Sequence, residues 1–292
     1  MQLNRSTGLF FLLVIGSSSL RAQTNTDLVG KLVSAENYFA AITREKGIAK
    51  AFLAVSDENT LVFRPGPLKA AEFFKDQPEN GAQLAWEPVY ARVARSGDWG
   101  FTTGPYTFKK SDTSSVISYG DYFSVWKKRK NGPWKLALDI GAPHPRPVAE
   151  RKLVFLNPDE QRFIHQQGKA RLQQRADIVQ SSDQLYATVL KADNAAARKE
   201  FLAENTRLLF PGEQPISGRT QVNAFWEKKQ VKVQSEYAGG DRALSGELAY
   251  TYGSMTIVSK GKVSTYTYVR LWEITPTFKW NVVMEVYAPA SN

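Results

Sequence analysis

Two matching stretches decide the fold of this chain: WKKRKNGPWKLALDIGAP at residues 126–143 and WEITPTFKWNVVMEVYAP at residues 272–289. Each begins with Trp, has a second Trp eight residues later and ends in Ala-Pro, so the two stand at a constant offset of 146 residues. Each also has two apolar segments around a turn, which is typical of a β-hairpin. An ordered series of matches at one offset indicates an internal duplication.

The duplication continues towards the N-terminus. The tripeptide ENT at residues 58–60 returns at residues 204–206, and both copies are followed by an apolar strand and a Pro-Gly turn. SGDWGFTTG at residues 96–104 resembles SGELAYTYG at residues 245–253, at an offset of 149 residues. The change of offset indicates a loop that differs in length by three residues between the copies.

Each copy has helical segments first and strand segments afterwards. Apolar residues at helical spacing predict a helix over 27–45 in the first copy, with Thr26 as its N-cap, and over 176–191 in the second. Helices followed by a run of antiparallel strands imply an α+β fold, with the helices packed on one face of a curved antiparallel sheet. We therefore expect two such domains with a connecting segment, at residues 26–145, 172–292 and 146–171 respectively.

The connecting segment begins as a Pro-rich, basic linker. Asn157 followed by Pro158 has the pattern of an N-cap and the first residue of a helix. We expect this helix to merge with the one over 176–191 unless Gly168 breaks it.

The N-terminus has the order of a secretory signal peptide over residues 1–22: Arg5, an apolar run of nine residues at 8–16, and the small residue Ala22. The run is far shorter than the ~20 residues that span a bilayer. We therefore expect a periplasmic or secreted protein with no membrane span after cleavage. The sequence has no Cys, which excludes disulfides, thiol catalysis and thiolate metal sites.

The formal net charge is +10, and its densest basic run is KKRK at residues 127–130. This run lies at the tip of the first predicted hairpin, where charges are usually solvated, and no aromatic residues are interleaved with it. We therefore expect no nucleic-acid partner. The chain has only two His, His144 and His165, at unrelated positions, so a His-based metal site is not expected. No dinucleotide or phosphate-binding motif is present, and we expect no cofactor.

Each copy resembles the nuclear transport factor 2-like superfamily, which includes SnoaL-like polyketide cyclases and ketosteroid isomerases. The resemblance is carried by the paired helices, the ENT strand with its Pro-Gly turn, a short helix with AEFF at 71–74 or NAFW at 223–226, and the closing hairpin. It implies a cone, in which a curved sheet wraps around helices and leaves a pocket at the wide end. Some members hold a catalytic Asp or His there, whereas others bind ligands or pair sheet to sheet. It also implies that the two copies form a pseudo-dimer within the chain.

Two carboxylates are candidate catalytic bases. Asp121 lies on a predicted strand among aromatic residues, where burial would raise its pKa. Its counterpart in the second copy is Thr267, so only the first domain would be active. Glu36 lies on the first helix and could face the mouth of the pocket.

Asp139 is a third acid, in the last strand of the first copy. Strand side chains alternate between two faces, and the residues in step with Trp134 as far as Ile140 are all apolar. This alternation puts Asp139 and its counterpart Glu285 on the opposite, outer face of the sheet, away from the pocket.

Aromatic residues at wall positions would line an apolar pocket if the cones are hollow, and would otherwise form the cores. These residues are Tyr38, Phe63, Trp86, Tyr90, Tyr106 and Trp126 in the first copy and Tyr186, Phe210, Trp226, Tyr250, Tyr252, Tyr268 and Trp272 in the second. We therefore expect a non-catalytic protein that binds a small, mostly apolar molecule or a partner surface. The alternative is a SnoaL-like acid–base enzyme, an isomerase, cyclase or hydrolase, that is active in the first domain only.

Overall fold

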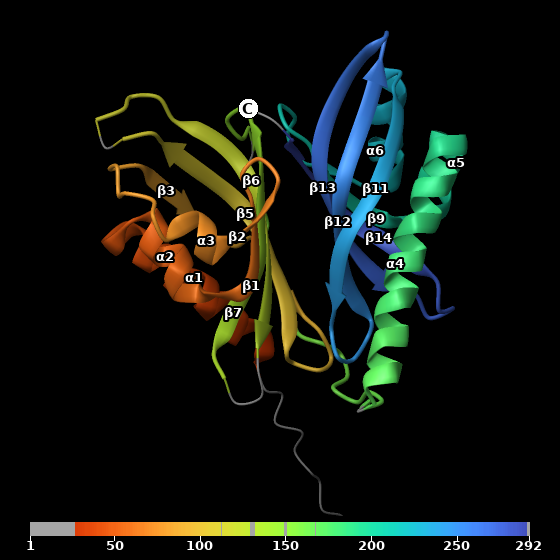
Figure 1. Ribbon diagram of the computed structural model, residues 1–292, viewed down its shortest axis with the longest axis horizontal. Helices are drawn as coiled ribbons and strands as arrows, with labels where there is room; N and C mark the ends of the chain where they lie inside the picture. The colour runs from red at the N-terminus through yellow and green to blue at the C-terminus, as the bar shows by residue number, and fades with distance from the viewer. Residues whose placement is uncertain (1–26, 112, 129–131, 149–150, 167, 291–292) are drawn as a thin grey trace, which may run out of the picture.

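The computed structural model describes residues 27–111, 113–128, 132–148, 151–166 and 168–290. The predicted signal peptide and Thr26 lie outside these residues. The chain forms two α+β halves that lie side by side, each with its helices on one face of a curved sheet (Figure 1). No helix in the described part of the chain is long and apolar enough to cross a membrane.

The first half begins with two helices and two strands, and a third helix and five more strands follow. The helices are α1 (Leu28–Lys46), α2 (Ile48–Val55) and α3 (Ala70–Phe74), and the strands are β1 (Ser56–Phe63), β2 (Pro67–Lys69), β3 (Gln83–Trp86), β4 (Tyr90–Val93), β5 (Trp99–Lys109), β6 (Ser118–Lys128) and β7 (Trp134–His144). Strand β8 (Val154–Leu156), from the connecting segment, pairs with β4 and completes an eight-stranded sheet in the order β2-β1-β7-β6-β5-β4-β8, with β3 paired to β5.

The second half repeats this order of elements. It contains α4 (Lys169–Ala192), α5 (Asn194–Phe201), β9 (Leu202–Leu209), β10 (Ile216–Ser217), α6 (Arg219–Lys229), β11 (Lys232–Arg242), β12 (Leu248–Ser259), β13 (Lys262–Ile274) and β14 (Trp280–Pro289). The sheet order β10-β9-β14-β13-β12-β11 matches that of the first half. The predicted α+β fold is confirmed, but the sheets are mixed, because β1 runs parallel to β7 and β9 runs parallel to β14.

A β-bulge in β7 changes which side chains enter the first half. Val125 of β6 pairs with Leu138, whereas the next residue, Trp126, pairs with Leu136, so Ala137 is an extra residue on β7. An extra residue reverses the alternation of side chains along the rest of the strand. Leu136 accordingly packs under the helices, while Leu138 packs on the outer face of the sheet.

The same bulge recurs in the second half, where Val283 is the extra residue of β14. Val282 packs in the core of that half, whereas Met284 packs on the outer face of the sheet. The prediction that Asp139 and Glu285 lie on the outer face is therefore wrong. Regular alternation ends at the bulge, and both acids point inward.

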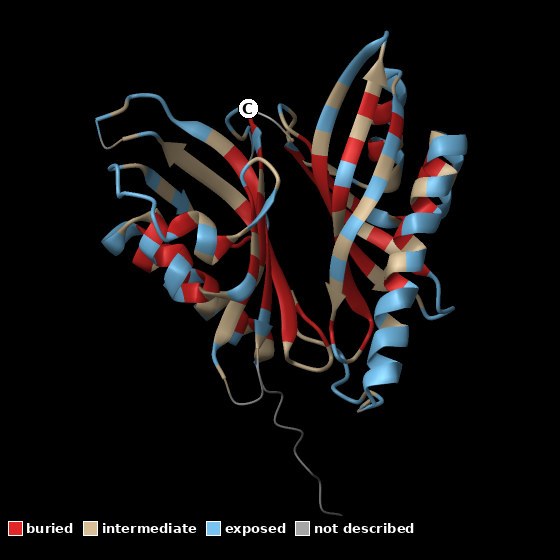
Figure 2. Ribbon diagram, viewed as in Figure 1, coloured by how far each residue is buried: buried red, intermediate tan, exposed pale blue. Residues whose placement is uncertain are grey.

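The outer faces of the two sheets pack against each other and form the sheet interface, an apolar cluster with members from both halves. Buried residues are concentrated along these facing strands in Figure 2. At its centre the rings of Trp99 and Tyr250 stack with centroids 6.5 Å apart. The cluster comprises Phe63, Ala94, Trp99, Phe101, Phe123, Val125, Leu138, Ile140 and Ala142 of the first half and Leu209, Ala243, Leu248, Tyr250, Val269, Leu271, Met284, Val286 and Ala288 of the second.

The connecting segment does not contain the predicted helix at Pro158. Asn157 caps a different helix, because its Oδ1 accepts a hydrogen bond of 2.9 Å from the backbone N–H of Val29 at the start of α1. Helix α4 begins directly after Gly168, the residue expected to break a merged helix.

Replacement of Leu138 by Ala tests the burial of this residue at the sheet interface. Leu138 is fully buried in the sheet interface, so L138A is expected to lower the free energy of unfolding by about 2–5 kcal/mol in urea titrations. A loss below ~1 kcal/mol would contradict the packing of Leu138 between the halves.

Candidate functional site

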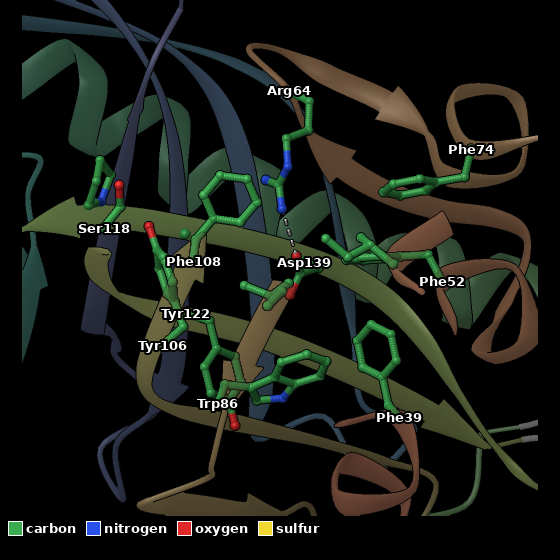
Figure 3. Close-up of a pocket in the computed structure, with 14 residues that line it drawn as sticks. Phe39, Phe52, Arg64, Phe74, Trp86, Tyr106, Phe108, Ser118, Tyr122 and Asp139 are labelled. Atoms are coloured by element: carbon green, nitrogen blue, oxygen red, sulfur yellow. Dashed lines mark ion pairs between the residues drawn. The ribbon is translucent and has the colours of Figure 1, made fainter. Parts of the chain in front are cut away.

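A cavity of about 390 Å³ opens in the first half between the helices and the inner face of the sheet. Helices α1, α2 and α3 contribute apolar side chains to one side, and strands β3, β5, β6 and β7 form the other (Figure 3). The lining is mainly aromatic: Phe39, Phe52, Phe74, Trp86, Tyr106, Phe108 and Tyr122, with Ile48, Leu84, Ser118, Gly141, Pro143 and the two charged residues Arg64 and Asp139. Such a lining suits an apolar ligand with a few polar groups.

Asp139 and Arg64 form the polar spot of the cavity. Arg64 Nη2 lies 3.6 Å from Asp139 Oδ1, and Ser124 Oγ donates a hydrogen bond of 2.9 Å to Asp139 Oδ2. Burial raises the pKa of the Asp139 carboxyl, although the Arg64 guanidinium and the Ser124 hydrogen bond oppose the shift. Asp139 is the acid of the cavity, at a position that strand alternation had placed outside it.

Small residues on β6 and β7 keep the cavity open. The Tyr106 ring lies across Gly120, where an added Cβ would stand 2.3 Å from the ring, and beside Gly141, where it would stand 3.2 Å away. The equivalent positions of the second half, identified by strand register, carry large side chains. The pairs of equivalents are Gly120 and Tyr266, Ser124 and Arg270, and Gly141 and Tyr287.

Arg270 occupies the interior of the second half. Its Nη1 lies 2.9 Å from Asp183 Oδ1 and its Nε lies 3.0 Å from Glu285 Oε1. The guanidinium carbon also lies over the rings of Tyr186 and Tyr268, at 4.3 and 4.1 Å from their centroids. One cation thus neutralises two buried acids.

Glu36 is the first-half equivalent of Asp183 and has no such cation. It is fully buried and accepts hydrogen bonds from Trp86 Nε1 at 2.6 Å, Trp126 Nε1 at 2.7 Å and Thr102 Oγ1 at 2.5 Å. Burial raises the pKa of its carboxyl from 4.5 to about 7, against the effect of the three donors. The expectation that Glu36 lies at the mouth of the pocket is wrong. It lies behind Trp86, whose ring lines the cavity.

Asp121 points away from the cavity. It is fully buried on the outer side of β6, where its Oδ2 lies 2.6 Å from His144 Nε2 and accepts a hydrogen bond of 2.8 Å from Arg151 Nη2. Arg207 of the second half approaches its Oδ1 to 3.7 Å. This carboxylate joins β6, the connecting segment and the second half, and it cannot meet a molecule in the cavity.

The predicted aromatic wall is divided among several environments. Trp86 and Tyr106 line the cavity, whereas Tyr38 is 62% exposed on α1. Phe63, Tyr90, Tyr250 and Tyr252 pack at the sheet interface, Trp126 packs beneath the helices of the first half, and Tyr186, Phe210, Trp226, Tyr268 and Trp272 pack in the core of the second.

Sequence reasoning did not single out most of the lining residues, which include Phe39, Phe52, Phe74 and Arg64. A comparison of residue sizes between the two copies could have located the hollow, because only the first copy has small residues at the three positions on β6 and β7. Among the residues that the structure describes, no group of three or more His, Asp or Glu side chains could hold a metal ion.

Comparison with known protein families and with curated proteins finds no match for this sequence. Solved structures match one half at a time. A ketosteroid isomerase-like protein from Erwinia carotovora atroseptica is 16% identical, with 40% of this chain and 98% of that chain covered and a TM-score of 0.36. A nuclear transport factor 2-like superfamily protein from Salmonella enterica serovar Typhimurium is 15% identical, covering 41% and 94%, with a TM-score of 0.35.

The two halves have the same strand order, with helices on one face of a mixed sheet. A third match, to an epoxide hydrolase of M. tuberculosis, is 8% identical, covers 41% of this chain and 80% of that chain, and has a TM-score of 0.32. At these identities the likeness concerns the fold alone. The chain is a tandem of two α+β units of the same topology, with a cavity in the first and the buried Arg270 in the interior of the second.

Glu36 gives the stability of the first half a predictable pH dependence. Folding raises the pKa of Glu36 from 4.5 to about 7, so the folded chain is more stable when Glu36 is neutral than when it is ionised. This part of the stability is lost as the pH rises from 4.5 through 7. The loss amounts to about 3 kcal/mol by pH 8. Urea unfolding at pH 5 and pH 8 is expected to show a smaller difference in E36Q than in the native chain, and equal differences would contradict the assignment.

Proposed function

We propose that this is an exported binding protein that holds a small, mostly apolar molecule in the cavity of its first half. The observation that carries the proposal is the aromatic cavity of about 390 Å³, which falls within the size range of small-molecule sites. Export is supported by the signal-peptide pattern of residues 1–22.

The cavity would orient its ligand through the Arg64 and Asp139 spot. Arg64 offers hydrogen-bond donors and the ionised Asp139 offers acceptors, so a neutral ligand with a hydroxyl or carbonyl group finds a partner there. The two charges are 3.6 Å apart and offset each other, so neither charge sign in a ligand is strongly favoured. The remaining lining is apolar or aromatic and would provide most of the binding free energy.

The second half would serve as a partner without a ligand of its own. Its interior is filled by Arg270 and Tyr287, both fully buried, at positions where the first half has Ser124 and Gly141. The outer face of its sheet covers the outer face of the first sheet. Binding in this proposal is thus confined to one half, and neither a cofactor nor a nucleic acid takes part.

A second candidate function is acid–base catalysis in the same cavity, and the position of Asp139 favours it. A carboxylate whose pKa is raised by burial is a stronger base when ionised than one in water. Asp139 lines the cavity, whereas Asp121 does not. The enzyme candidate therefore rests on Asp139, with Arg64 as the group that would stabilise negative charge developing on a substrate.

Replacement of Gly141 by Tyr, the residue of the second half, tests the binding proposal. A Tyr side chain at this position should fill the cavity, so the affinity for the neutral apolar fluorophore N-phenyl-1-naphthylamine is expected to fall at least tenfold. Fluorescence titration measures the affinity, and circular dichroism checks the fold. Y38A is the control, because Tyr38 is exposed away from the cavity. Native affinity in G141Y would contradict the proposal, as would failure of the native chain to bind.

Replacement of Asp139 by Asn separates the two functions. Asn removes the base and keeps the size of the side chain, so D139N is expected to bind the same fluorophore with an affinity within about threefold of the native value. If a screen of carbonyl and epoxide compounds finds turnover, that turnover should fall by at least 100-fold in D139N. Turnover that persists in D139N would exclude Asp139 as the base.

A further inference from the structure

The sheet interface is nearly two-fold symmetric where the β4–β5 turn meets the β11–β12 turn. Ser96 and Ser245 occupy equivalent positions in the two copies, and they contact each other across the interface. Ser245 Oγ accepts a hydrogen bond of 3.0 Å from the backbone N–H of Ser96, and the two hydroxyl oxygens lie 2.8 Å apart. A residue that contacts its own equivalent marks the axis of an isologous interface.

Two charged pairs at this interface do not follow the symmetry. Arg92 Nη2 lies 2.6 Å from Glu273 Oε1, and Lys127 Nζ lies 2.7 Å from Asp241 Oδ2. The first half supplies both cations and the second half supplies both acids. Each pair is partly exposed, with side chains 26–45% accessible.

Strand register shows that the two pairs occupy equivalent places. Arg92 pairs with Phe101 in the first sheet as Asp241 pairs with Tyr250 in the second. Lys127 pairs with Trp99 as Glu273 pairs with Leu248. The symmetry operation therefore maps the Arg92–Glu273 contact onto the Asp241–Lys127 contact. Equivalent positions carry opposite charges, so the first half supplies the cation in both contacts.

A third contact has the same sense. Glu247 of the second half accepts a hydrogen bond of 2.6 Å from the backbone N–H of Arg95, and its Oε2 lies 3.5 Å from Arg95 Nε. The equivalent of Arg95 is Leu244, so this contact has no symmetric copy. Asp98, the equivalent of Glu247, and Asp121 are acids on this face of the first half. Asp98 lies within the electrostatic influence of Lys127, and Asp121 is paired with Arg151 and approached by Arg207.

The charges decide which faces can pair, whereas the apolar residues do not. Both faces are apolar at their centres, so burial alone would allow two first halves or two second halves of different chains to pair. Pairing of two first halves would place Arg92 against Lys127, and pairing of two second halves would place Asp241 against Glu273. Like charges at such distances oppose association.

We propose that this charge pattern commits the two halves to each other and prevents homotypic pairing between copies of the chain. A tandem chain with two self-complementary faces could link copy to copy in an open-ended array, through first halves at one end and second halves at the other. The acidic and basic faces remove that route. The outer face of the first sheet fits a sheet face that carries acids opposite Arg92 and Lys127. The second half of the same chain provides that face, through Glu273 and Asp241.

Three full-length variants test the proposal. R92E/K127E places acids against Glu273 and Asp241. K127E/D241K keeps both ion pairs but makes each face self-complementary. R92E/K127E/D241K/E273K keeps both ion pairs but puts the acids on the first half and the cations on the second, so neither face is self-complementary. K232E/K262E is the control for net charge, because both of these lysines are exposed strand residues.

Urea unfolding measures the pairing within one chain. The midpoint of R92E/K127E is expected to fall by about 0.5 M or more, and that of the fourfold variant is expected to match the native chain. K232E/K262E should leave the midpoint within about 0.2 M of the native value. An unchanged midpoint in R92E/K127E, or a fourfold variant no better than R92E/K127E, would overturn the proposal.

Light scattering after refolding from urea measures pairing between chains. K127E/D241K is expected to show a mass that rises with protein concentration above that of the native chain, whereas the fourfold variant should match the native chain. Equal mass distributions for these two variants would overturn the proposal. This comparison decides the matter even if R92E/K127E does not fold, because both variants keep their ion pairs.

Discussion

The extra residue in the last strand of each half is the constraint on which the rest of the structure depends. Each sheet is buried on both faces, under helices on one side and against the other sheet on the other. One strand must therefore supply apolar side chains to two faces in succession. The bulge at Ala137 achieves this: Leu136 enters the core of the first half, and Leu138 enters the sheet interface. The same shift turns Asp139 inward, so the acid of the cavity follows from the packing of its neighbours.

Each half has two buried acids that point inward, and the two halves stabilise these acids in different ways. In the second half, Arg270 forms ion pairs with both Asp183 and Glu285 and is fully buried. Removal of one member of such a triad would leave an unpaired buried charge. In the first half, Ser124 replaces the arginine, so Glu36 is held by neutral donors and Asp139 by a partly exposed Arg64.

The pairing of the sheets links this asymmetry to the stability of the cavity. The strands that line the cavity on their inner face, β6 and β7, are covered on their outer face by the second half. The second half also contacts the end of β7, where the backbone N–H of Gly212 donates a hydrogen bond of 2.8 Å to the carbonyl of Pro143. Pro143 lines the cavity. The second half thus contacts the cavity strands of the first half both across the sheet and at the end of β7.

The sequence by itself determined the duplication, the α+β class and the order of elements, because repeated residues at a fixed offset and helical or strand periodicity are local properties. It did not locate the site. The aromatic neighbours of Asp121 favour it as a base, but β6 turns it outward to His144 and Arg151. Asp139 was assigned to the outer face because regular alternation does not reveal a bulge, which depends on the pairing of β6 with β7. Asn157 has the pattern of an N-cap for the residues that follow it, yet it caps α1 from 128 residues away. Which face a side chain occupies, and which partner it meets, was decided only by tertiary packing, since both depend on contacts between segments that are distant in the chain.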